Sequence, residues 1–169
     1  IATHRNRSQC YRNPITKKSH GIASLSHGDR IKNISILNNT ISNNTTTLEG
    51  SQGGGIYCRG DSTLVIFNNT ITKNAVARLS TYSSGGGGIY CSGNPKIFNN
   101  IISNNSVFGS VAGGGGGGIY CDNGNPFISN NTITNNAVYS GNGGAIYIYN
   151  PINNTSSPVF TNNTISNNA

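Results

Sequence analysis

The chain has 169 residues, with eleven Lys and Arg against four Asp and Glu, and carries a formal net charge of +7. Asn (29 residues) and Gly (23 residues) supply 52 of the 169, whereas apolar residues make up 34%, below the roughly 45–50% of ordinary globular chains. Because Gly and Asn are poor helix formers, and because no apolar run approaches the about 18–20 residues of a membrane-spanning helix, the composition argues against a helical bundle, a doubly wound enzyme and a membrane span.

The beginning of the chain is basic. We interpret residues 1–19 as a basic N-terminal extension or cap, and residues 20–169 as the folded domain. This basic start could bind polyanions or an acidic surface, or it could simply be solvated. The later Lys and Arg residues occur singly and without interleaved aromatics, so no nucleic-acid partner is predicted. The six basic residues of the first 30 are Arg5, Arg7, Arg12, Lys17, Lys18 and Arg30.

The sequence contains no Met and begins at Ile1. We interpret this as a processed chain or an internal fragment. Secretion would explain it, and we therefore expect an extracellular or cell-surface location.

Two short blocks alternate along the chain. The first reads ILNNTISNN at 36–44 and returns as IFNNTITKN (66–74), IFNNIISNN (97–105), ISNNTITNN (128–136) and FTNNTISNN (160–168). The second, GGGIYC, ends at Cys58, Cys91 and Cys121, and returns as GGAIYI ending at Ile148. A fixed period is the mark of a repeat architecture and excludes disorder.

Within each block, apolar and β-branched residues lie two apart, as residues on one face of a strand do. Each repeat therefore predicts three short strands separated by turns. Strands that recur in the same order favour an all-β fold, a right-handed parallel β-helix of about five coils stacked about 4.8 Å apart.

When coils stack, each residue lies directly over the equivalent residue of the neighbouring repeat. We expect inward columns of Ile and Phe, and an Asn ladder at the turn between two strands, where stacked amides bond to one another and to the turn backbone. The expected columns are Ile36, Ile66, Ile97, Ile128 and Phe160; Ile41, Ile71, Ile102, Ile133 and Ile165; and Asn39, Asn69, Asn100, Asn131 and Asn163.

These repeats resemble the parallel β-helix proteins of the pectate-lyase-like superfamily. The nearest resemblance is to surface proteins and autotransporter passengers with GGA[ILV] and FxxN repeats, such as chlamydial polymorphic membrane proteins. GGAI occurs at 143–146, GGGI occurs three times, and FxxN in the aligned register occurs at Phe160–Asn163. The resemblance implies the fold; members range from polysaccharide lyases to adhesins, passengers and filament components.

A lyase or hydrolase on this fold requires clustered carboxylates. The chain has four acidic residues, which are far apart and occupy different repeat positions: Asp29, Glu49, Asp61 and Asp122. The sequence therefore argues against an enzyme. His4, His20 and His27 lie without a partnering Cys or carboxylate cluster, and no metal or cofactor is predicted.

Cys58, Cys91 and Cys121 share one repeat position, which Ile148 fills in a later copy. Because Ile replaces Cys there, we expect a buried, apolar thiol ladder. Neighbouring coils also lie within disulfide range, so a Cys58–Cys91 or Cys91–Cys121 bond remains open.

Two outward rows are candidate binding surfaces. Tyrosines alternate with the inward Ile and Cys residues and should stack outward, either as a strip that holds sugar rings or another copy, or as a shield beneath the Gly-rich loops. Hydroxyl residues form a second lattice, similar to ice-binding solenoids but broken by Ile101. The first row is Tyr57, Tyr90, Tyr120 and Tyr147, and the second includes Thr40, Thr70, Thr72, Thr132, Thr134 and Thr164.

The sequence thus predicts a non-catalytic extracellular structural or adhesive β-solenoid. The expected partner is a second copy stacked end to end into a filament, or the neighbouring repeats of a longer surface passenger. The alternatives are a carbohydrate-binding or polysaccharide-degrading β-helix and, more remotely, an ice-binding solenoid.

Overall fold

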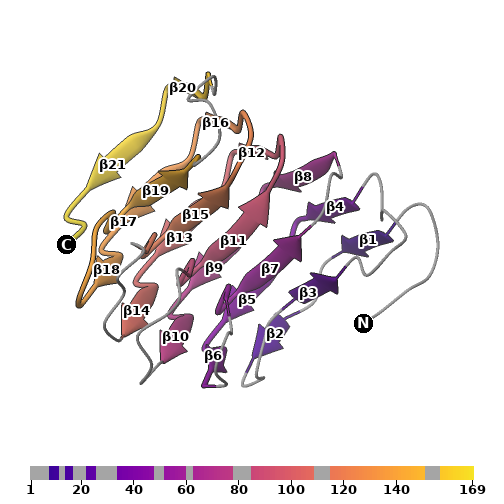
Figure 1. Ribbon diagram of the computed structural model, residues 1–169. Helices are drawn as coiled ribbons and strands as arrows, with labels where there is room; N and C mark the ends of the chain where they lie inside the picture. Colours follow the sequence, from indigo (N-terminus) through magenta and orange to yellow (C-terminus); the bar gives the residue numbers. More distant parts are fainter. Residues whose placement is uncertain are drawn as a thin grey trace.

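The computed structural model describes residues 8–11, 14–16, 22–25, 34–47, 52–59, 63–77, 85–108, 115–150 and 157–169. These residues form 21 strands and no helix. Every strand pairs only with parallel neighbours, so the chain winds as a parallel β-helix (Figure 1). The predicted all-β solenoid is confirmed.

Each of four successive coils contributes four strands, one to each of four sheets. The first sheet receives β4 (Ile34–Leu37), β8 (Leu64–Phe67), β12 (Lys96–Phe98) and β16 (Phe127–Ser129). The second receives β5 (Thr40–Ser42), β9 (Thr70–Thr72), β13 (Ile101–Ser103) and β17 (Thr132–Thr134). The third receives β6 (Thr45–Thr46), β10 (Ala75–Ala77), β14 (Ser106–Phe108) and β18 (Ala137–Val138). The fourth receives β7 (Ile56–Arg59), β11 (Ile89–Ser92), β15 (Ile119–Asp122) and β19 (Ile146–Tyr149).

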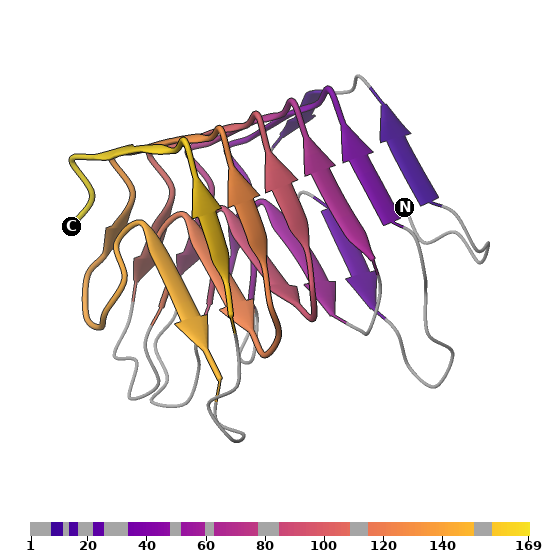
Figure 2. The same cartoon turned by 90° about the horizontal axis from the view of Figure 1, so that it is seen from above.

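Shorter sets of strands flank these four coils. β1 (Ser8–Tyr11), β2 (Pro14–Thr16) and β3 (Ile22–Leu25) pair with β4, β5 and β7. β20 (Val159–Thr161) and β21 (Thr164–Ser166) pair with β16 and β17 at the opposite end of the stack (Figure 2). Strands therefore occur within residues 1–19 as well, while the interpretation of that segment as an extension or cap stays a prediction.

The third sheet adds a strand to the three that were predicted for each repeat. Its strands are two or three residues long and share few letters: TT, AVA, SVF and AV. Their common feature is one column, in which Thr46, Val76, Val107 and Val138 lie in register.

The core consists of the predicted aliphatic columns. Ile36, Ile66, Ile97 and Ile128 are fully buried and lie in register with Phe160. The column that begins at Ile41 is equally continuous, through Ile71, Ile102, Ile133 and Ile165. Each buried side chain of this size contributes roughly 1.5–3 kcal/mol relative to exposure, so the columns hold neighbouring coils together.

Two Asn ladders line the corners on either side of the second sheet. In the first, the backbone N–H of Asn100 donates to Asn131 Oδ1 at 2.9 Å. The Asn100 side-chain amide lies 3.0 Å from the same oxygen and 2.9 Å from the carbonyl oxygen of Ile66, one coil back. The predicted ladder is therefore confirmed. The second, equally buried ladder is Asn44, Asn74, Asn105, Asn136 and Asn168.

A residue with positive φ precedes each ladder Asn and turns the chain. At the first corner it is always Asn, with φ between 52° and 58°. Asn adopts this left-handed region more readily than other non-Gly residues. At the second corner Lys73 stands where the other coils have Asn43, Asn104, Asn135 and Asn167.

The Gly run before each IYC strand meets a steric requirement. A Cβ on Gly86 would fall 1.7 Å from the carbonyl oxygen of Ile89, and one on Gly116 would fall 1.8 Å from that of Ile119. No side chain fits at these two positions, which accounts for part of the high Gly content.

Lys73→Asn should stabilise the chain. Lys73 holds φ at 56°, a conformation that Asn adopts at lower cost, so we expect the free energy of unfolding to rise by about 0.5–1 kcal/mol. Denaturant titration measures the change. Lys96→Asn, at the exposed first residue of β12, is the control and should give no gain.

Thr46→Val should also stabilise the chain. The Thr46 hydroxyl is buried without a hydrogen-bond partner in the described part of the structure, whereas the matching positions in β10, β14 and β18 hold Val. Removing this unsatisfied oxygen should raise the free energy of unfolding by about 1 kcal/mol. The exposed neighbour variant Thr45→Val should change it little, and an equal gain there would contradict the assignment.

Candidate functional surfaces

The four tyrosines of the fourth sheet stack on one another. Tyr57, Tyr90, Tyr120 and Tyr147 lie in register, with successive ring centroids 5.1, 5.3 and 5.4 Å apart. However, Tyr90 and Tyr120 are only 1% exposed. The expectation of an open outward strip is therefore wrong for the two central rings. Only the half-buried Tyr57 and Tyr147 are accessible to a ligand in this row.

The buried Tyr90 hydroxyl is tied to the next coil. It donates to Asp122 Oδ2 at 2.8 Å, and Asn123 Nδ2 donates to Asp122 Oδ1 at 2.9 Å. Burial, together with the Asp122 carboxylate, raises the pKa of Tyr90 far above its usual range. Asp122 thus acts as an acceptor that links two coils, and Tyr90 remains protonated.

The other candidate residues for acid–base or metal chemistry lie outside the described residues: Asp29, Glu49, Asp61, His4, His20 and His27. Within the described ranges, no three His, Cys, Asp or Glu side chains gather in a way that could hold a metal ion.

The predicted hydroxyl rows lie on the second sheet. One row runs through Thr40, Thr70, Thr132 and Thr164, with Ile101 in its middle. The other contains Thr72 and Thr134, and Thr72 Oγ1 lies 3.1 Å from Ser103 Oγ of the next coil. Thr40, Thr132 and Thr164 are exposed, and Thr70, Thr72 and Thr134 are half-buried. Ile101 is 49% exposed, so an apolar side chain interrupts the lattice at the surface.

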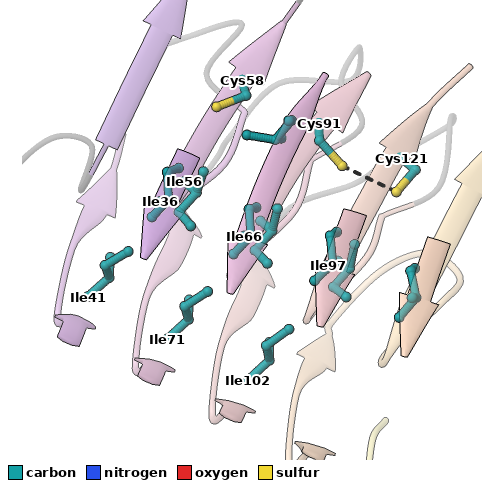
Figure 3. Close-up of a cluster of buried hydrophobic side chains, with 14 of the residues drawn as sticks. Ile36, Ile41, Ile56, Cys58, Ile66, Ile71, Cys91, Ile97, Ile102 and Cys121 are labelled. Atoms are coloured by element: carbon teal, nitrogen blue, oxygen red, sulfur yellow. Dashed lines mark hydrogen bonds between the residues drawn. The ribbon is translucent and has the colours of Figure 1, made fainter. Parts of the chain in front are cut away.

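The cysteines of the fourth sheet face the core. Cys58, Cys91 and Cys121 are buried and lie in register, followed by Ile148. The sulfurs of Cys91 and Cys121 are 3.3 Å apart (Figure 3). The hydrogen bond to Cys121 and burial raise the pKa of the Cys91 thiol well above its usual value.

Two outward aromatic groups were not predicted. On the first sheet, Phe67 and Phe98 are in register, with ring centroids 4.7 Å apart. Phe108 and the following coil's Tyr139 stack at 4.4 Å, and both are exposed. Comparing the residue after each inward Ile, down the column, would have revealed the first pair. The second belongs to the third sheet, which the repeat pattern did not predict.

The coil formed by β20 and β21 exposes residues of the core columns. Phe160 is 45% exposed and Ile165 is 49% exposed, although the equivalent Ile side chains of the preceding coils are fully buried. Their strands are the outermost members of the first and second sheets. In the part of the chain that the structure describes, this end therefore combines exposed apolar side chains with strand edges that no further strand pairs, and such edges can template further pairing.

A family model described as a right-handed beta helix region matches residues 3–151. No curated protein and no solved structure matches the chain. Among the described residues, no helix has the length and apolar character needed to cross a membrane.

Raising the pH should reveal the Tyr90 contact. Because the pKa of Tyr90 is raised in the folded state, its contribution to stability is complete below the unfolded value near 10 and is lost as the pH rises above it. Above pH 10 the unfolding free energy of the native chain should fall more steeply than that of Tyr90→Phe, by up to about 1.4 kcal/mol per pH unit. Denaturant titrations between pH 8 and 11 measure this. Equal slopes for the native chain and Tyr90→Phe would contradict the assignment.

Proposed function

We propose that this chain, which belongs to the right-handed β-helix family, is a non-catalytic extracellular structural or adhesive β-solenoid that stacks end to end with a second copy. The observation that carries this proposal is the exposed coil of β20 and β21, whose inward columns match those of the buried coils in register. The likeness to surface proteins and autotransporter passengers is part of the same proposal.

The two ends of the stack support association between copies. The first sheet runs from β1 to β20 and the second from β2 to β21, always in parallel. Within the described residues, the outermost strand at either end of each sheet has one edge without a neighbouring strand, and these edges have the same strand direction. A contact between opposite ends is heterologous, and repetition of such a contact builds a filament when the rotation does not close.

The apolar surface supplies the driving force. Covering Phe160 and Ile165 with another coil would bury side chains of a size that contributes roughly 1.5–3 kcal/mol each on full burial. Added backbone hydrogen bonds along β20 and β21 would satisfy the open edge. Unlike Ile101 and Phe108, which are exposed on the sides of the solenoid, Phe160 and Ile165 belong to columns whose members are fully buried in the four preceding coils, so the end is where association is expected.

Ile165→Asp should weaken self-association at least tenfold, because a buried charge at the junction is costly. Sedimentation velocity over a concentration series measures the effect, and electron microscopy shows whether rods form. The control Thr164→Asp places the same charge on the outward face of the same strand and should associate nearly as the native chain does. A native chain that remains a monomer throughout the series contradicts the proposal.

Carbohydrate binding is the second candidate, favoured by the exposed stacked pair Phe108 and Tyr139. A glycan array would show retention of a polysaccharide by the native chain and its loss in Tyr139→Ala, with Tyr149→Ala as an exposed aromatic control. Degradation of the polysaccharide would instead support the alternative of a polysaccharide-degrading β-helix.

A further inference from the structure

The interior of the fourth sheet brings two thiols into contact. Cys91 in β11 and Cys121 in β15 are directly paired residues of neighbouring strands, and both are fully buried. Their sulfurs lie 3.3 Å apart and point toward each other, whereas the sulfur of Cys58 points away from Cys91 (Figure 3). One pair in the row is therefore arranged differently from the other.

The backbone geometry suits a covalent bond. Neighbouring strands of a sheet lie about 4.7–4.9 Å apart, within the roughly 4.4–6.8 Å that separates the Cα atoms of a disulfide. The two sulfurs would need to approach from 3.3 Å to about 2.05 Å. Rotation of the two side chains is the movement that would bring the sulfurs together.

We propose that Cys91 and Cys121 are a site of disulfide formation, which joins β11 to β15 and cross-links two consecutive coils inside the solenoid. This inference is independent of end-to-end association, because the pair lies in the middle of the stack.

The oxidant is a low-molecular-weight disulfide of the glutathione class. One cysteine thiolate attacks it, forming a mixed disulfide and releasing one glutathione thiolate. The second cysteine thiolate then attacks the mixed disulfide at the protein sulfur and releases the second glutathione. The two protons lost by the cysteines end on the two released thiols, so one oxidised glutathione is reduced for each bond formed.

Folding sets when this exchange occurs. In the folded chain both thiols are buried, and the pKa of Cys91 is raised well above its usual value by the hydrogen bond to Cys121 and by burial. Since the thiolate is the reactive form, exchange belongs to the stage before the coils close. Once formed, the bond is shielded from reductants by the same burial.

Refolding from guanidinium in a glutathione buffer, followed by alkylation and trypsin digestion without reduction, tests the proposal. The basic residues of the sequence place the four cysteines on separate peptides: 8–12, 33–59, 79–96 and 97–169. We expect 79–96 joined to 97–169, with the other two alkylated. A joined pair of any other composition, or no joined pair, overturns the assignment.

Thermal unfolding of the same material provides the second measurement. Closing the 91–121 loop should raise the unfolding temperature by roughly 7–15 °C relative to the chain refolded under reducing conditions. Cys58→Ala removes one buried thiol of the same row and should retain this difference, whereas Cys121→Ala should abolish it. Retention of the difference in Cys121→Ala would contradict the proposal, whatever the absolute stability of either variant.

Discussion

The structure depends on buried asparagine amides that bond from coil to coil. A corner of the solenoid removes backbone groups from water, and unpaired buried groups are costly. Asn105 illustrates the solution, because its amide reaches both the Ile71 carbonyl oxygen of the preceding coil and the Asn136 oxygen of the following one. The same residue therefore closes the turn and fixes the register, which is why the chain requires so much Asn.

Fixed register determines the remaining packing. Because each corner lies directly over the next, the strands between corners place equivalent side chains in columns. Ile66, for example, lies between Ile36 and Ile97. The columns in turn exclude water from the Asn ladders. Polar corners and aliphatic walls thus stabilise each other, although apolar residues make up only 34% of the chain.

The aliphatic columns, the thiol row and the first Asn ladder could be predicted from the sequence because the repeat fixes which residues are equivalent. The third sheet was not predicted, since strands as short as Thr45–Thr46 carry no alternation of their own. The sequence left open whether Tyr90 is accessible or covered, because alternation indicates that a side chain points away from the core, but not whether other atoms cover that side. The contact between the Cys91 and Cys121 sulfurs depends on side-chain rotation, which repeat spacing does not specify.

Both Asn ladders donate in one direction along the axis. The side-chain amide of Asn39 donates to Asn69, Asn69 to Asn100 and Asn100 to Asn131, and the ladder that begins at Asn44 has the same sense. Amide dipoles aligned in this way add. The solenoid is consequently polar along its axis, and head-to-tail contacts between copies would keep the ladders of every copy pointing the same way.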